Sequence, residues 1–181
     1  AEAGTYTLYL TSDDGSAIYI DGEPVINNDG LHWFKEQSIT LDLSAGAHEI
    51  EVRYFERGGE ATLQLEWEGP DSNGQREVIS GEALSHGDMG DDHDGGHDDN
   101  DTGDNGGHDG HDDGDQGAGG GSNMPGLLGT YFVMGSGISS LSQIDFDATP
   151  DGTGMIEELN TYRSDGSMWD GGPSDDFAAR Y

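Results

Sequence analysis

The chain has no cysteine among its 181 residues, and only six lysines and arginines stand against 38 aspartates and glutamates. No disulfide framework can therefore hold the fold, and the formal net charge of −32 excludes electrostatic binding of nucleic acid or of an anionic membrane. The sequence also has no apolar run long enough to span a bilayer, so it predicts no membrane insertion. Cations and neutral ligands are the partners that suit so acidic a chain.

Apolar and polar side chains alternate through residues 4 to 85, which is the pattern of half-buried antiparallel strands. The alternating apolar sets are Tyr6, Leu8 and Leu10; Ile39, Leu41 and Leu43; Ile50, Val52 and Tyr54; and Leu63, Leu65 and Trp67. Asp-Gly, Ala-Gly and Gly-Pro turn signals separate these sets, and no segment has a helical period. The region therefore predicts an all-β fold, an antiparallel β-sandwich.

Residues 86 to 121 are different in kind, with twelve aspartates, five histidines and almost no apolar side chain. Such a segment cannot bury enough apolar surface to offset the entropy lost on ordering it, so we expect an acidic linker over 86–123. This linker divides the chain into one half of a sandwich at 1–85 and another at 124–181. In the second half, residues 126–132, residues 144–146 and the end of the chain predict strands.

The acidic tract is also a candidate for weak calcium binding at several sites, because calcium prefers oxygen ligands. It lacks the regular repeats of a calcium β-roll and the spacing of an EF-hand loop. The alternative interpretation is a solvated, charged spacer. The candidate ligands are Asp91, Asp92, Asp94, Asp98, Asp99, Asp101, Asp112 and Asp113.

Two adjacent carboxylates, Asp13 and Asp14, stand at the tip of a predicted hairpin and are followed by Gly15. Neighbouring aspartates in a tight turn repel each other unless a cation lies between them. The pair therefore indicates a calcium site, and the alternative is a plain β-turn.

With this turn, the chain resembles the protective-antigen-type β-sandwich family (the PA fourteen domain), which occurs in bacterial toxins, glycosidases, bacterial adhesins and flocculin-type lectins. The stretch 45–59, with its Ala-Gly-x-His start and Tyr-Phe end, and the Leu-x-Trp strand at 65–67 also resemble the family. The pieces that open the family's domain resemble residues 126–181, so the two halves stand in rotated order. The chain is then either circularly permuted, or split so that each half is completed by a neighbouring copy.

In the lectin members of this family, the aspartate pair is joined by a cis peptide bond and binds calcium, which in turn chelates two vicinal hydroxyls of a sugar. The resemblance assigns this role to Asp13 and Asp14. It implies a second calcium loop that offers backbone carbonyls, with a carboxylate in place of the family's asparagine. The residues of that loop are Glu56, Arg57, Gly58 and Gly59.

The resemblance implies a calcium-dependent, lectin-like carbohydrate-binding module of an extracellular adhesin or secreted surface protein. Its cofactor would be Ca2+, its partners glycans or cell-surface polysaccharide, and Trp169 would stack on the sugar. The alternative is a calcium-stiffened structural repeat or filament subunit that pairs with copies of itself. The sequence has no nucleophile elbow, no cysteine and no phosphate loop, so we expect no enzyme.

Overall fold

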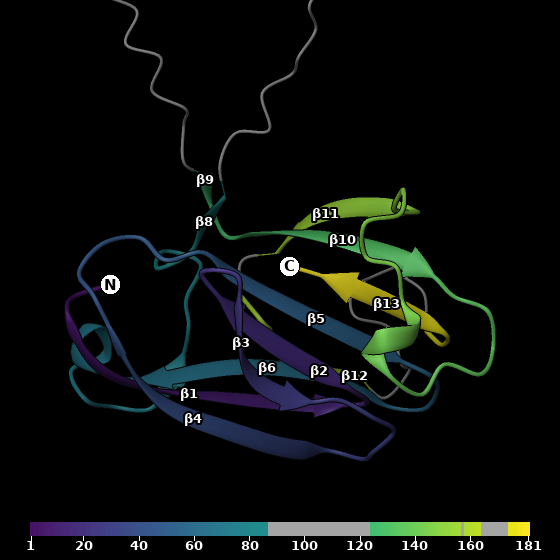
Figure 1. Ribbon diagram of the computed structural model, residues 1–181, viewed down its shortest axis with the longest axis horizontal. Coiled ribbons are helices and arrows are strands. Elements are labelled where there is room, and N and C mark those ends of the chain that lie inside the picture. The colour runs from purple at the N-terminus through teal and green to yellow at the C-terminus, as the bar shows by residue number, and fades with distance from the viewer. Residues whose placement is uncertain (87–123, 157, 164–173) are drawn as a thin grey trace, which may run out of the picture.

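The computed structural model describes residues 1–86, 124–156, 158–163 and 174–181, which form strands, loops and two short 3-10 helices (Figure 1). None of the described helices is long and apolar enough to cross a membrane. In chain order the elements are β1 (Gly4–Asp13), β2 (Ser16–Ile20), β3 (Glu23–Asn28), β4 (Lys35–Leu43), β5 (Ile50–Glu56), β6 (Ala61–Glu68), η1 (Pro70–Ser72), β7 (Glu77–Val78), β8 (Ser85–His86), β9 (Met124–Pro125), β10 (Leu127–Val133), η2 (Leu141–Gln143), β11 (Gly152–Ile156), β12 (Asn160–Arg163) and β13 (Phe177–Arg180).

Two antiparallel sheets lie one above the other (Figure 1). One sheet has the order β12-β6-β1-β4, with β7 also pairing β6, and the other has the order β11-β10-β13-β5-β2-β3. A separate ribbon joins β8 to β9. The architecture confirms the predicted all-β, antiparallel sandwich.

The core lies between the two sheets and is built from the alternating apolar residues of the strands. On β1, Tyr6, Leu8 and Leu10 are at most 2% exposed, because every second side chain of the strand faces the other sheet. In the opposite sheet, Val52 and Tyr54 of β5 face inward in the same way. The β4 residues of the predicted pattern are half-buried, since β4 is the edge of its sheet and has a neighbour on one side only.

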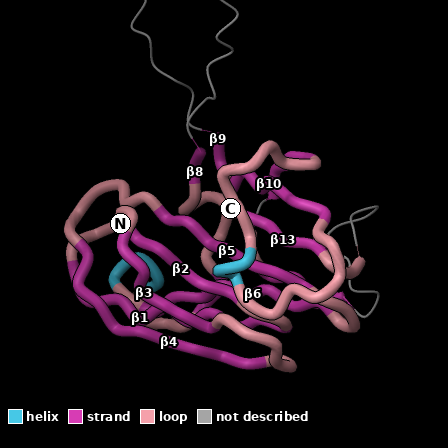
Figure 2. Tube along the Cα trace, turned by 45° about the vertical axis from the view of Figure 1, so that its right-hand side comes forward, coloured by secondary structure: helices cyan, strands magenta, loops and turns pink. Residues whose placement is uncertain are grey.

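Strands from both ends of the chain pair within the same sheets. β12 lies antiparallel to β6, with Tyr162 opposite Thr62, and β13 lies antiparallel to β5, with Ala179 opposite Tyr54. Figure 2 shows β13 beside β5. The described residues of 1–86 and 124–181 therefore share one core, while the rotated family order and an exchange of halves between copies remain predictions.

The predicted strand at residues 144–146 is wrong. These residues follow η2 in a loop, yet Ile144 and Phe146 are less than 10% exposed. They cover a row of side chains on the outer side of the second sheet, where Phe55, Ala178 and Phe132 lie in register across three strands. The alternating apolar residues at 144–146 are buried because they pack onto the face of a sheet, and they do not form a strand of that sheet.

Several predicted features fall outside the described residues. These are nearly all of the acidic linker at 86–123, with its candidate cation ligands at 91–113, and Trp169.

Candidate metal and ligand site

Three loops meet at one end of the sandwich, and the Asp14 carboxylate holds them together. One of its oxygens accepts a hydrogen bond from the backbone N–H of His32 in the β3–β4 loop, at 3.0 Å. The other accepts from the N–H of Arg57 in the β5–β6 loop, at 3.2 Å. Asp14 itself lies in the β1–β2 turn and is only 7% exposed, so a buried side chain fixes the positions of both neighbouring loops.

The turn that carries the aspartate pair needs a glycine at position 15. The carbonyl of Gly15 accepts a hydrogen bond from the N–H of Phe55, at 2.9 Å. A Cβ atom on Gly15 would lie 2.3 Å from the ring of Phe55 and 2.9 Å from the backbone nitrogen of Gly30. Only glycine permits so close an approach of the turn to β5.

A third carboxylate, that of Glu56 at the end of β5, is almost completely buried. It is 1% exposed, and its two oxygens accept hydrogen bonds from the Gly58 N–H at 2.6 Å and the Tyr54 hydroxyl at 3.0 Å. The Tyr54 hydroxyl is also hydrogen-bonded to the backbone carbonyl of Asp13. Tyr54 thus links the third carboxylate to the backbone of the aspartate pair.

Asp13, Asp14 and Glu56 form a group that could hold a metal ion. Each offers a carboxylate oxygen, and these three oxygens lie within 4.8 Å of one another. The set contains only hard oxygen donors, so its chemistry suits a hard cation such as calcium.

In this cluster, burial and the neighbouring negative charges disfavour the ionised forms of Glu56 and Asp13. Burial, reinforced by the neighbouring charges of Asp14 and Asp13, raises the pKa of Glu56 to about 8, against the opposing effect of its two hydrogen bonds. Burial and the Asp14 charge also raise the pKa of Asp13. A bound cation would remove this repulsion, because it favours the ionised form of each carboxylate.

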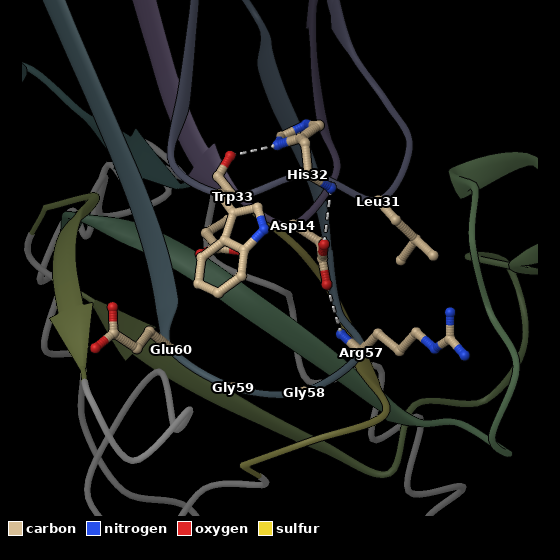
Figure 3. A pocket seen from close by; sticks show the side chains of 9 residues that line it. Asp14, Leu31, His32, Trp33, Arg57, Gly58, Gly59 and Glu60 are labelled. Atoms are coloured by element: carbon tan, nitrogen blue, oxygen red, sulfur yellow. Dashed lines mark hydrogen bonds between the residues drawn. The ribbon is translucent and has the colours of Figure 1, made fainter.

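A cavity of about 430 Å³ opens beside the aspartate pair (Figure 3). The Trp33 side chain on its rim is exposed, with 84% of its surface in contact with solvent. In Figure 3, Glu60 and Arg57 lie at opposite ends of the Gly58–Gly59 segment, and their side chains point away from each other. The lining residues are Asp13, Asp14, Leu31, His32, Trp33, Arg57, Gly58, Gly59 and Glu60.

The structure brings together the residues that the sequence assigned to both calcium loops. The peptide bond between Asp13 and Asp14 is cis, as the resemblance implies. Arg57 and Gly58 supply N–H donors to the carboxylates of the cluster, whereas coordination of a cation by the backbone carbonyls of this loop remains a prediction.

The sequence favours Trp169 over Trp33 as the residue that stacks on a sugar, and it indicates no role for Leu31. Trp33 and Leu31 nevertheless line the cavity from the β3–β4 loop. A signal was present: Leu31, Trp33 and Phe34 are large apolar residues in a stretch between two strands, where polar residues are the rule. Trp169, the sequence's candidate for stacking on a sugar, lies outside the described residues.

Comparison with known proteins agrees with this geometry over the first part of the chain. The family model of the PA14 domain matches residues 1–79, which hold Asp13, Asp14, Glu56 and the loops around them. Neither a curated protein nor a solved structure gives a significant match. The whole candidate site therefore lies within the part of the chain that matches the PA14 domain family.

Proposed function

We propose that the protein is a calcium-dependent carbohydrate-binding module, and that it acts at the cell surface or in a secreted protein. PA14 domains are found in carbohydrate-binding and adhesin-like proteins. The observation that carries the proposal is the cluster of Asp13, Asp14 and Glu56, with the aspartate pair lining an open cavity that has an exposed tryptophan on its rim.

The chemistry of the cluster supports a sugar as the ligand. Calcium takes six to eight oxygen ligands, and three carboxylates leave some of these positions free. Vicinal hydroxyls can fill two of them in place of water. The exposed indole of Trp33 offers an apolar face against which the C–H side of a sugar ring can pack.

The buried Glu56 favours binding over catalysis. A carboxylic acid with a pKa of about 8 could act as a general acid. However, both oxygens of Glu56 already accept hydrogen bonds, and the residue is not among those lining the cavity. A general acid must reach its substrate, and Glu56 does not reach the cavity. We therefore assign Glu56 to the support of a cation.

Retention of the protein on immobilised glycans tests the proposal. We expect calcium-dependent retention that a chelator abolishes, and no retention of the double variant Asp13→Asn with Asp14→Asn. The matched control replaces Asp42 and Asp147 by Asn, since both carboxylates lie away from the site, on β4 and in the loop after η2. Retention of the site variant equal to that of the control would place the sugar elsewhere.

The second candidate function, a structural repeat that exchanges halves with its neighbours, is favoured by one observation. The pairings of β12 with β6 and of β13 with β5 join separate parts of the chain, so the same contacts could form between two copies. Size-exclusion chromatography with light scattering, at low and high calcium, distinguishes the two. A monodisperse monomer in both conditions would reject exchange between copies.

A further inference from the structure

The candidate site contains an unpaired positive charge in a chain that has very few of them. Lys and Arg number six, against 38 Asp and Glu. Among the described residues, Arg53, Arg76 and Arg180 each form an ion pair with a carboxylate. The guanidinium of Arg57 has no carboxylate partner within the described part of the chain, although it lines the cavity beside the aspartate pair.

The arrangement of the loop keeps this guanidinium available. The backbone N–H of Arg57 is held by the Asp14 carboxylate, so the residue has a fixed position next to the cluster. Its side chain extends from that point along the side of the cavity where Leu31 lies (Figure 3). A planar guanidinium presents paired N–H donors that match the two oxygens of a carboxylate or sulfate.

The nearest acidic residue of the same loop is engaged elsewhere. Glu60 also lines the cavity, but its carboxylate accepts a hydrogen bond from the hydroxyl of Tyr162 on β12, which raises the pKa of that tyrosine. In Figure 3 its side chain points away from Arg57. The negative charge of Glu60 is thus held on the opposite side of the cavity from the arginine.

We propose that the site prefers an anionic saccharide, whose diol occupies the cation while its carboxylate or sulfate pairs with Arg57. This inference rests on the proposed function. The local charge differs from that of the whole chain, because a divalent cation neutralises two of the three carboxylate charges and Arg57 stands beside them. Salt screens charges more than about 8 Å apart at physiological ionic strength, so the groups around the cavity dominate the potential that a ligand meets there.

Matched sugars that differ only at C6 test the preference. Isothermal titration in calcium compares methyl galacturonoside with methyl galactoside, and methyl glucuronoside with methyl glucoside. We expect the acid of at least one pair to bind about fivefold more tightly than its neutral partner, the effect of one exposed ion pair. Arg57→Gln is expected to reduce this ratio to about one, and Arg57→Lys to keep part of it. Arg76→Gln is the matched control, since it removes the same charge at a distance from the site and should preserve the ratio.

Each outcome has a distinct meaning. Equal binding of acid and neutral sugar, with chelator-sensitive binding of both, would overturn the anionic preference and leave the proposed function in place. A preference that survives Arg57→Gln would overturn the role of Arg57. Absence of calcium-dependent binding for all four sugars would overturn the proposed function, and the inference with it.

Discussion

Two regions of the chain, residues 1–86 and the described part of 124–181, contribute different things to one sandwich. Among the described residues, the first region holds all three carboxylates of the cluster and all the residues that line the adjoining cavity. The described part of the second region supplies core side chains, such as Leu127, Phe177 and Ala179. It reaches the site where Asp175 accepts a hydrogen bond from the Gly59 N–H at 3.2 Å and where the Tyr162 hydroxyl donates to Glu60.

The residues that form the site and the residues that stabilise the fold therefore come from different parts of the chain. The site is local in sequence, since its loops all connect strands β1 to β6, whereas the core that supports those strands is not. Tyr54 makes the connection: its hydroxyl binds Glu56, and its ring packs 5.8 Å from that of Phe177. The second region therefore supports a site to which it contributes no ligand among its described residues.

The largest effect is expected from a truncation in the second region. Phe177→Ala should lower the free energy of unfolding by about 3–5 kcal/mol, because a completely buried ring is removed from the core. Urea denaturation measures this loss. Val133→Ala, on the neighbouring strand opposite Phe177, is 60% exposed and should cost less than about 0.5 kcal/mol. If Phe177→Ala cost no more than the control, the two regions would not share a core.

Calcium should stabilise the fold by a smaller amount, through the first region. At a free concentration 100 times Kd, binding to the folded state alone contributes about 2.7 kcal/mol to the free energy of unfolding. Denaturation with and without calcium measures this gain, and the variant carrying Asp13→Asn and Asp14→Asn should lose it. An equal gain in that variant would place the stabilising calcium outside the cluster.

The raised pKa of Glu56 predicts a pH dependence of the calcium-free protein. The Glu56 carboxyl group has a pKa of about 8 in the folded protein and 4.5 in the unfolded chain. Between pH 4.5 and about 8 it is therefore protonated in the folded protein and ionised in the unfolded chain. Its contribution to stability is complete below about pH 4.5 and is lost as the pH rises through 8, with a slope of about 1 kcal/mol per pH unit near pH 7. Denaturation curves from pH 5 to 8 measure the slope.

Two comparisons sharpen this pH prediction. Glu56→Gln removes this titrating group, so it should remove its part of the slope and leave the part that comes from His48, whose pKa is raised by its hydrogen bond to Asp21. Calcium binding near neutral pH should release about one proton, which titrations in buffers of different ionisation enthalpy detect. A stability that does not change with pH in the calcium-free protein would mean that Glu56 ionises normally.

The smallest effect is expected at the rim of the cavity. Trp33→Ala should weaken saccharide binding about fivefold, or about 1 kcal/mol, through the loss of stacking. It should not change the stability of the fold, because the side chain is 84% exposed. Phe34→Ala is the matched control, as Phe34 is also exposed but does not line the cavity. Equal losses for both variants would argue against a specific stacking contact.

The strands of the first region could be predicted because apolar and polar residues alternate within the strand itself. In β1, the alternation of Tyr6, Leu8 and Leu10 with polar residues specifies both the strand and its buried face. Residues 144–146 show the limit of this approach. Their short apolar pattern fits a strand equally well, and only the row of side chains formed by Phe55, Phe132 and Ala178 decides that they pack over a sheet.

The site was predictable where the ligands are adjacent in sequence and where a family resemblance names the second loop. Asp13 and Asp14 could be identified from the sequence of one turn. The position of Trp33 beside them could not be predicted in this way, because it depends on the hydrogen bond from the His32 N–H to Asp14, which no local sequence pattern encodes. Contacts between loops arise from the fold as a whole.

The two hydrogen bonds accepted by Asp14 affect how much conformational entropy the protein loses when it binds a ligand. Since one carboxylate holds both the β3–β4 and the β5–β6 loops, the walls of the cavity are set before a ligand arrives. A pre-organised site loses little conformational entropy on binding, so the Asp14 side chain contributes to affinity without having to touch the ligand. Hydrogen exchange at the amides of His32 and Arg57 would report this ordering directly, and both amides should be exchange-protected in the absence of any sugar.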